Sequence, residues 1–189
     1  MRPYFKQRVT ENAGSVAQER GQMEYWDIYD KNKKKTGRTM ERNNWCLKDD
    51  EYHLTVLGVV CRPDGKFLIT KRVMTKSWAP GWWEVSGGGV QAGEESKDAC
   101  LREIREETGL DVSGFDGGYV FTYHRENPGQ GDNYFVDVYK FIGNFEMDDV
   151  TLQENETDGG MLADKEQIKK LAEEGNFLHY DSIKRVFED

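Results

Sequence analysis

The alternation of apolar and polar positions predicts several β-strands in this chain. Residues 24–30 (EYWDIYD) alternate with a period of two, as a half-buried strand does. Residues 53–61 (HLTVLGVVC) are rich in β-branched side chains and predict a buried strand, followed across a Pro-Asp-Gly turn by a hairpin partner at 66–72. Further strands are predicted at residues 84–86, 119–124 and 134–141.

Two segments are expected to be helical. Gly109 is typical of the residue that closes a helix, and Ser96 or a neighbour is the expected N-cap. The apolar side of this central helix would consist of Ala99, Cys100, Leu101 and Ile104. Residues 166–175 predict a second helix. The order of the expected elements is strands, a central helix, more strands and a late helix. This order indicates an α/β fold, namely an α/β/α sandwich with a mixed β-sheet.

The remaining segments divide the chain into an extension and one domain. Residues 1–22 are polar and lack periodicity, which predicts a flexible N-terminal extension before a single domain at 23–189. A lysine-rich stretch at 31–37 is expected to be a solvated hairpin turn, because exposed charge runs are usually solvated. Residues 73–83 and 127–132 are expected to be loops.

Charge and composition narrow the class of protein. With 35 acidic and 26 basic residues the net charge is −9, which disfavours nucleic acid as a partner. No stretch approaches the roughly 18 to 20 apolar residues that span a bilayer, and the first residues do not resemble a signal peptide. The three cysteines fit no metal-ligand spacing and are expected to be reduced thiols. We therefore expect a cytoplasmic protein with no membrane partner.

Three glutamates in the central helix are the strongest chemical signal. Glu103, Glu106 and Glu107 stand at i, i+3 and i+4 and therefore share one face of the helix. Their like charges repel unless a cation joins them, and Mg²⁺ or Mn²⁺ prefers such oxygen ligands and takes others from substrate phosphates. The pattern indicates a metal-dependent phosphate site, with a solvated acidic face as the alternative.

Glycines and an arginine surround these carboxylates in the sequence. Gly87, Gly88 and Gly89 are expected to form a loop with positive φ that passes close to a metal and a diphosphate. Arg102 lies four residues before Glu106. We expect it to pair with Glu106 or Glu94 and so to hold carboxylates in place.

The segment 88–110, GGVQAGEESKDACLREIREETGL, resembles the Nudix box, and every defining position of that pattern is filled. This resemblance to the Nudix hydrolase superfamily implies the sandwich fold and hydrolysis of a diphosphate linkage in a nucleoside diphosphate joined to another group X. It also implies that Glu103, Glu106 and Glu107 bind Mg²⁺ or Mn²⁺, which activates water. The structural positions of the box would be Gly88, Glu94, Arg102 and Gly109.

Other segments resemble a branch related to isopentenyl diphosphate isomerase, among them EYHLTV and PGWWEVSGGG. The isomerase cysteine belongs just before the glycines, and residues 76–89 contain none. Hydrolysis is therefore favoured over isomerisation. A non-catalytic Nudix-fold nucleotide-binding regulator is the other alternative, although such a protein would be expected to have lost some of the carboxylates.

The sequence leaves the general base open. Glu106 or Glu107 could take the proton from water, and so could Glu154 or Glu156 in the 152–156 segment, unless that segment is only a solvated loop.

Candidate substrate contacts lie at the start of the box and in the segments before it. The backbone of Gly88 and Gly89 would approach the phosphates, Arg72 would bind an anion, and Trp78 would stack on a base. The alternatives are a surface charge for Arg72, an anchored loop for the tryptophans, and simple packing for His53, which opens a buried strand. A small-molecule diphosphate is the expected substrate, and homodimerisation and the identity of X stay open.

Overall fold

The computed structural model describes residues 23–153 and 155–188. The predicted extension at residues 1–22 and the candidate base Glu154 lie outside the described residues.

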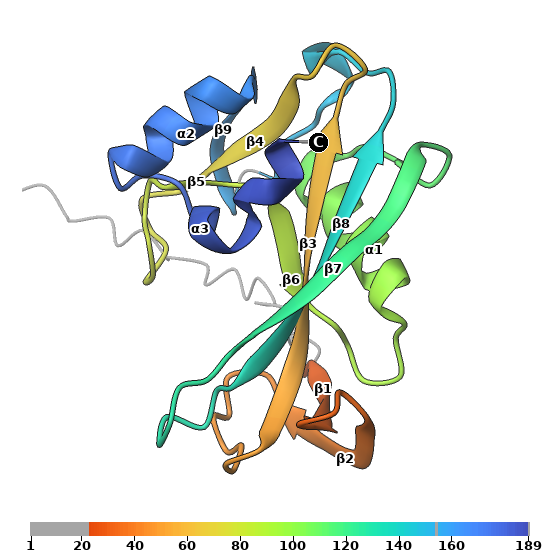
Figure 1. The fold of residues 1–189 in the computed structure, drawn as a ribbon, viewed down its shortest axis with the longest axis vertical. Coiled ribbons are helices and arrows are strands. Elements are labelled where there is room, and N and C mark those ends of the chain that lie inside the picture. The colour runs from red at the N-terminus through yellow and green to blue at the C-terminus, as the bar shows by residue number, and fades with distance from the viewer. Residues whose placement is uncertain (1–22, 154, 189) are drawn as a thin grey trace, which may run out of the picture.

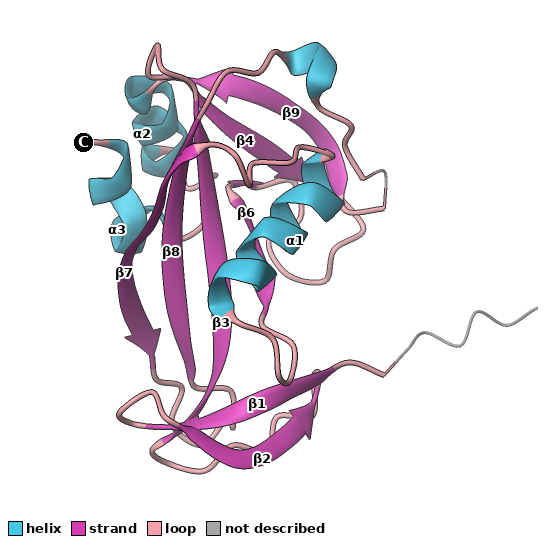
Figure 2. Ribbon diagram, turned by 90° about the vertical axis from the view of Figure 1, so that its right-hand side faces the viewer, coloured by secondary structure: helices cyan, strands magenta, loops and turns pink. Residues whose placement is uncertain are grey.

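Nine strands of the described residues form one mixed sheet (Figures 1 and 2). The strands are β1 (Tyr25–Asp30), β2 (Lys35–Glu41), β3 (Glu51–Cys61), β4 (Phe67–Arg72), β5 (Trp83–Glu84), β6 (Ser86–Gly89), β7 (Asp116–Arg125), β8 (Tyr134–Ile142) and β9 (Thr157–Ala163). The helices are α1 (Ser96–Thr108), α2 (Lys165–Glu173) and α3 (Tyr180–Ile183), with short 3₁₀ turns η1 (Met147–Asp149) and η2 (Lys184–Phe187).

The long strand β3 organises the sheet. It runs parallel to β8, from the pair His53 and Tyr134 to the pair Cys61 and Ile142. It runs antiparallel to β1, β4 and β6, while β7 pairs with β8 and both β5 and β9 pair with β4. The mixed sheet predicted from the sequence is therefore confirmed.

Helices cover both faces of the sheet. The side chains of β3 alternate between the two faces and therefore contribute to two separate cores. Val56 and Val60 point to the face covered by α1, where they pack with Ile104. Val59 points to the opposite face and packs with Ile168 of α2. Figure 2 shows α1 on one side of the sheet and α2 and α3 on the other, which confirms the sandwich.

The sequence did not predict strands β2 and β9. Strand β2 begins at Lys35, inside the stretch expected to be a turn. It was missed because KTGRTME is an exposed edge strand without an apolar pattern. Strand β9 reads TDGGMLA, and its two glycines conceal the strand character. The late helix is present but spans Lys165–Glu173, after a capping box between Asp164 and Gln167.

A lysine between β1 and β2 adds a side-chain contact to the strand pairing that joins this hairpin to the sheet. The Nζ atom of Lys33 contacts the Oδ1 atom of Asp137 on β8 and lies 3.2 Å from Thr122 Oγ1 on β7. The Asp137 side chain is only 3% exposed, and it also accepts a hydrogen bond from Ser96 at 2.6 Å. The expectation that the whole lysine run is solvated is therefore wrong for Lys33.

Candidate active site

Helix α1 carries the three candidate metal ligands on the side away from the core. Its buried face consists of Ala99, Cys100, Ile104 and Thr108. The chain enters the helix through Glu95, the neighbour of Ser96, and leaves it at Gly109, whose φ of 72° is left-handed and whose N–H donates to the Arg105 carbonyl. Because the apolar face packs in the core, the glutamates on the other side of the helix line a pocket beside the glycine strand β6.

Glu103, Glu106 and Glu107 line a pocket of about 210 Å³ against β6, which we call the acidic pocket. Its lining contains five carboxylates and two guanidinium groups, those of Glu24, Glu103, Glu106, Glu107, Glu156, Arg42 and Arg102. Carboxylates therefore outnumber basic groups around this space.

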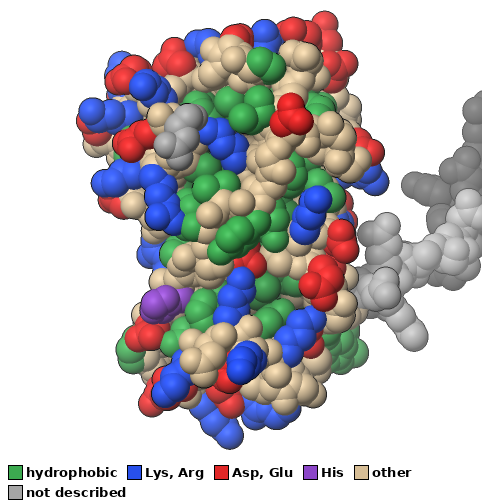
Figure 3. Space-filling model, turned by 45° about the vertical axis from the view of Figure 1, so that its right-hand side comes forward, with side chains coloured by type: hydrophobic (Ala, Val, Ile, Leu, Met, Phe, Trp, Pro, Cys, Tyr) green, Lys and Arg blue, Asp and Glu red, His purple; other side chains and the backbone are tan. Residues whose placement is uncertain are grey.

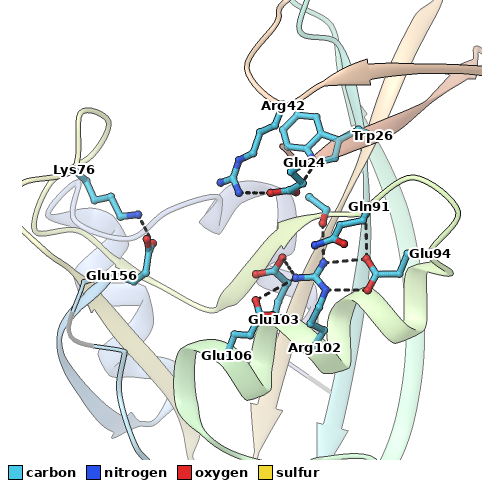
Figure 4. A network of polar contacts seen from close by, with 11 residues as sticks. Glu24, Trp26, Arg42, Lys76, Gln91, Glu94, Arg102, Glu103, Glu106 and Glu156 are labelled. Carbon is cyan, nitrogen blue, oxygen red and sulfur yellow. Dashed lines mark hydrogen bonds and ion pairs between the residues drawn. The ribbon is translucent and has the colours of Figure 1, made fainter. Parts of the chain in front are cut away.

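Arg102 binds the carboxylates around it (Figure 4). Its Nε and Nη2 atoms donate to the two oxygens of Glu94 at 2.9 and 3.0 Å, and Nη2 also donates to the Gly89 carbonyl at 3.1 Å. Its Nη1 atom donates to Glu103 at 2.7 Å and to Glu106 at 3.2 Å. Both pairings considered from the sequence are present, and Glu103 is a third partner.

The glycines of β6 differ from expectation in their backbone. They belong to an extended strand that pairs with β3, and Gly87, Gly88 and Gly89 do not adopt the left-handed conformation. The expectation of a loop with positive φ is therefore wrong, because strand pairing determines the backbone. Close approach is nevertheless present: a Cβ on Gly88 would lie 2.4 Å from the Glu103 carboxyl carbon, and one on Gly89 would lie 2.6 Å from the Trp26 indole.

Burial and charge repulsion affect the protonation of these carboxylates. Burial raises the pKa of Glu107 well above its usual range, the charges of Glu84 and Glu103 raise it further, and hydrogen bonds from Ser86 and Gly87 oppose the change. Burial also raises the pKa of Glu103, against the lowering effect of Arg102. Burial acts in the same direction on Glu94, but hydrogen bonds from Arg102 and from the Gln91 N–H outweigh it and lower the Glu94 pKa.

The carboxylate oxygens of Glu103, Glu106 and Glu107 are suitable ligands for a hard divalent cation. In this structure, however, the three side chains do not converge on a common position. Among residues 23–153 and 155–188, no three His, Cys, Asp or Glu side chains are grouped closely enough to hold a metal ion. Arg102 binds Glu103 and Glu106, while Glu107 is directed to Ser86 and Gly87. The donors are carboxylate oxygens, which Mg²⁺ and Mn²⁺ prefer. The Glu103 carboxylate occupies the space that a side chain on Gly88 would fill.

The loop before β9 brings Glu156 to the acidic pocket. It is tied to the end of α1, because Thr151 N–H donates to the Thr108 carbonyl at 2.8 Å and Gln153 N–H donates to the Glu107 carbonyl at 3.2 Å. The Glu156 side chain forms an ion pair with Lys76 (Figure 4). The loop therefore places a carboxylate opposite the helix.

Two charged residues of the acidic pocket, Glu24 and Arg42, were not identified from the sequence. Glu24 accepts hydrogen bonds from Trp26 Nε1 and from Arg42, both at 2.7 Å. Pairing of β1 with β2 brings Glu24 and Arg42 together, as the hydrogen bond from Arg42 N–H to the Glu24 carbonyl shows. Because β2 was not predicted, the sequence carried no usable signal for this contact.

A second pocket, of about 280 Å³, contains the other candidate substrate contacts, and we call it the ring pocket. Aromatic rings line one end and a basic group the other, with a floor from the sheet between them. The ring end is formed by Trp26, Trp45, His53 and Tyr134, and the basic end by Arg72, Trp78 and His179. Gly87 and Gly88 line both the ring pocket and the acidic pocket, so the two pockets meet at β6.

At the basic end, Arg72 is held by an ion pair. Its Nη1 atom lies 3.0 Å from both oxygens of Glu84, and its guanidinium lies over the Trp78 ring at 5.5 Å. The Trp78 ring is 58% exposed and lies 5.9 Å from the His179 ring. Arg72 is therefore a partly neutralised cation beside an accessible indole.

At the ring end, His53 packs among aromatic rings and does not line the acidic pocket. Its ring stacks on Trp26 at 4.5 Å, with Tyr134 at 5.4 Å and Trp45 at 6.1 Å. Burial lowers the pKa of His53 to about 4. This histidine is thus a neutral wall of the ring pocket.

The outer surface carries both signs of charge. On the face shown in Figure 3, blue and red side chains are interspersed around patches of apolar atoms. Within the described part of the chain, none of the helices is long and apolar enough to cross a membrane.

Comparison with known proteins shows that the resemblance to the Nudix family reaches beyond the box at residues 88–110. The NUDIX domain family model matches residues 51–186. An uncharacterized Nudix hydrolase of Listeria monocytogenes is 32% identical over 168 residues, which is 87% of this chain and 94% of that protein. The CTP pyrophosphohydrolase of Escherichia coli is 35% identical over 77 residues, covering 41% of this chain and 55% of the relative.

Solved structures show the same fold. A crystal structure of the protein DR0079 from Deinococcus radiodurans superposes with a TM-score of 0.65 at 22% identity, covering 81% of this chain and 91% of the other. Three observations indicate the same family. They are the filled box in β6 and α1, the matched domain, and the relative that is similar over nearly its full length. The chain therefore belongs to the Nudix hydrolase family.

Proposed function

We propose that this protein is a divalent-metal-dependent pyrophosphohydrolase that cleaves a diphosphate linkage in a nucleoside diphosphate joined to another group X. The observation that carries the proposal is the acidic pocket, where Glu103, Glu106 and Glu107 of one helix face the glycine strand β6. The name of the CTP pyrophosphohydrolase relative supports the same reaction class.

The proposed metal site consists of Glu103, Glu106 and Glu107. Bound Mg²⁺ or Mn²⁺ would supply charge neutralisation at the phosphate oxygens and a lowered pKa of water. Arg102 fixes the position of Glu103 through a 2.7 Å hydrogen bond and is itself held by Glu94. Gly88 leaves the space that the Glu103 carboxylate occupies.

A carboxylate of this chain would remove the proton from the attacking water. Glu156 lines the acidic pocket on the side opposite α1 and is a candidate for this step, with Glu106, Glu107 and Glu154 as the other candidates. The proposed nucleophile is water, so the reaction needs neither a serine nor a cysteine. The isomerase alternative is disfavoured because residues 76–89, just before and at the glycines, contain no cysteine.

The test is a screen of nucleotide sugars, NADH, dinucleoside polyphosphates, nucleoside triphosphates and other nucleoside diphosphate derivatives with Mg²⁺ or Mn²⁺. Selective release of monophosphate or phosphate products that stops with chelator and with Glu107→Gln is the expected result. Glu107→Gln keeps the shape of the side chain and removes its charge. Equal turnover with this variant, or turnover that survives chelation, would contradict the proposal.

A further inference from the structure

The ring pocket is built partly by a segment outside the matched family domain. The domain match begins at residue 51, whereas Trp26 of β1 and Trp45 of the following loop line the ring end. The Cβ position of Gly89 is filled by the Trp26 indole, so the hairpin packs directly on the strand that borders the acidic pocket. The segment before the matched domain therefore contributes two of the four aromatic residues of the ring end.

Buried polar atoms on the walls of this pocket lack hydrogen-bond partners. Among the described residues, four buried atoms have no such partner, and all four residues line the ring pocket: His53 Nδ1, Arg72 Nε, Tyr123 Oη and Asp132 Oδ1. Buried polar atoms are normally paired, because an unpaired one costs stability. Atoms of this kind at the wall of a cavity indicate a ligand that supplies the missing partners.

The chemistry of the walls defines that ligand. Flat aromatic surfaces lie beside His53: the ring of Trp45, a residue that is 47% exposed, and the ring of Tyr134. Such surfaces suit a planar heteroaromatic ring. Asp132 belongs to this end, because the preceding Gly131 carbonyl accepts a hydrogen bond from Leu47 N–H in the Trp45 loop. A carboxylate oxygen can only accept, so the ring must offer a donor to it.

We propose that the ring pocket binds the nucleobase of the substrate and that Asp132 accepts a hydrogen bond from an amino group on that base. The inference rests on the proposed function for the direction of the phosphates, which would pass over Gly87 and Gly88 into the acidic pocket. Arg72 Nε, at the other end, is a donor available to an oxygen of the ligand. Asp132 is then a specificity-determining residue that prefers amino-bearing bases.

The test measures binding without turnover. Adenosine 5′-monophosphate and purine riboside 5′-monophosphate differ only in the amino group, as do cytidine 5′-monophosphate and its 4-deamino analogue. Each is titrated into the full-length protein with EDTA present, and calorimetry and tryptophan fluorescence report binding. We expect the amino-bearing member of at least one pair to bind about tenfold more tightly, because the acceptor is a carboxylate.

Three variants separate the amino-group contact from ring stacking. Asp132→Ala should reduce the ratio within that pair to about one, whereas Asp132→Asn, which keeps an acceptor oxygen, should retain part of the preference. Trp45→Ala should weaken both members of the pair by a similar factor. Asp116→Ala, an exposed aspartate at the start of β7, is the matched control and should leave every affinity unchanged.

The outcomes distinguish this inference from the proposed function. An unchanged ratio in Asp132→Ala would overturn the role of Asp132. Failure of all four nucleotides to bind at millimolar concentration, or binding unaffected by Trp45→Ala, would overturn the base site. These titrations contain no metal and involve no turnover. If the nucleotides bind here but the metal-dependent screen detects no hydrolysis, only the hydrolase proposal is contradicted.

Discussion

The carboxylate of Glu103 occupies the place where a side chain on Gly88 would begin. A Cβ on Gly88 would lie 2.4 Å from the Glu103 carboxyl carbon and from its Oε1 atom. Gly88 pairs with Val56 of the buried strand β3, so the strand cannot shift easily to relieve a clash. The glycine thus creates space for a proposed metal ligand.

Gly88→Ala is expected to displace Glu103 and to lower kcat/KM at least about tenfold, roughly 1.4 kcal/mol of transition-state stabilisation. Metal-dependent turnover is the measurement, with circular dichroism to confirm folding. Gly114→Ala is the control, because a Cβ at Gly114 meets nothing within 4 Å. Wild-type turnover in a folded Gly88→Ala protein would show that the position of Glu103 does not matter.

Removal of Arg102 should destabilise the protein. Arg102→Ala leaves Glu94 and Glu103 without their guanidinium partner, and both carboxyl groups are largely shielded from solvent. We expect the free energy of unfolding to fall by about 2 kcal/mol in urea titrations. Arg105→Ala on the same helix loses only an exposed pair with Asp111 and should have almost no effect. Equal effects of the two variants would contradict this interpretation.

Lys33 is expected to anchor the hairpin that completes both pockets. Lys33→Met leaves the buried Asp137 without a cation, so the free energy of unfolding should fall by about 2 kcal/mol in chemical denaturation. Protection of β1 amides against hydrogen exchange should fall as well. Lys34→Met, at the exposed neighbouring position, is the control. A loss as large in Lys34→Met would show that general charge, not the contact with Asp137, matters.

Acid should destabilise the protein through His53. Burial lowers the pKa of His53 from its ordinary value of 6.5 to about 4, so below pH 6.5 the unfolded chain binds the proton first. The stabilisation is complete above pH 6.5 and is lost as the pH falls towards 4.

The comparison is between wild type and His53→Phe, which keeps a ring against Trp26. Wild type should lose about 2 kcal/mol more than the variant between pH 7 and 4.5, measured by urea titration at each pH. Parallel pH profiles would show that His53 does not titrate differently in the folded state.

Local chemistry made the central part of the protein predictable. The position of Glu103, Glu106 and Glu107 on one side of a helix follows from the repeat of about 3.6 residues per turn. Gly109 as the helix end follows from the backbone freedom of glycine. The long apolar strand β3 was recognisable because its β-branched side chains are buried on both faces.

Elements with weak patterns were not predictable in this way. Strand β2 is polar because it lies at an exposed edge, and β9 contains two glycines. The glycines of β6 were expected to form a loop, since glycine is common in loops, but pairing with β3 makes them a strand. Partners distant in the sequence decided these cases, and a local pattern does not contain them.

The sequence by itself determined the Nudix box, the carboxylate face of α1 and the order of the main strands, because these depend on neighbours along the chain. Only the tertiary structure decided what surrounds that face. Glu24 and Arg42 reach the acidic pocket through the pairing of β1 with β2, and Trp45 meets His53 through the path of a loop. Such contacts form where separate segments pack together, and packing depends on the whole fold.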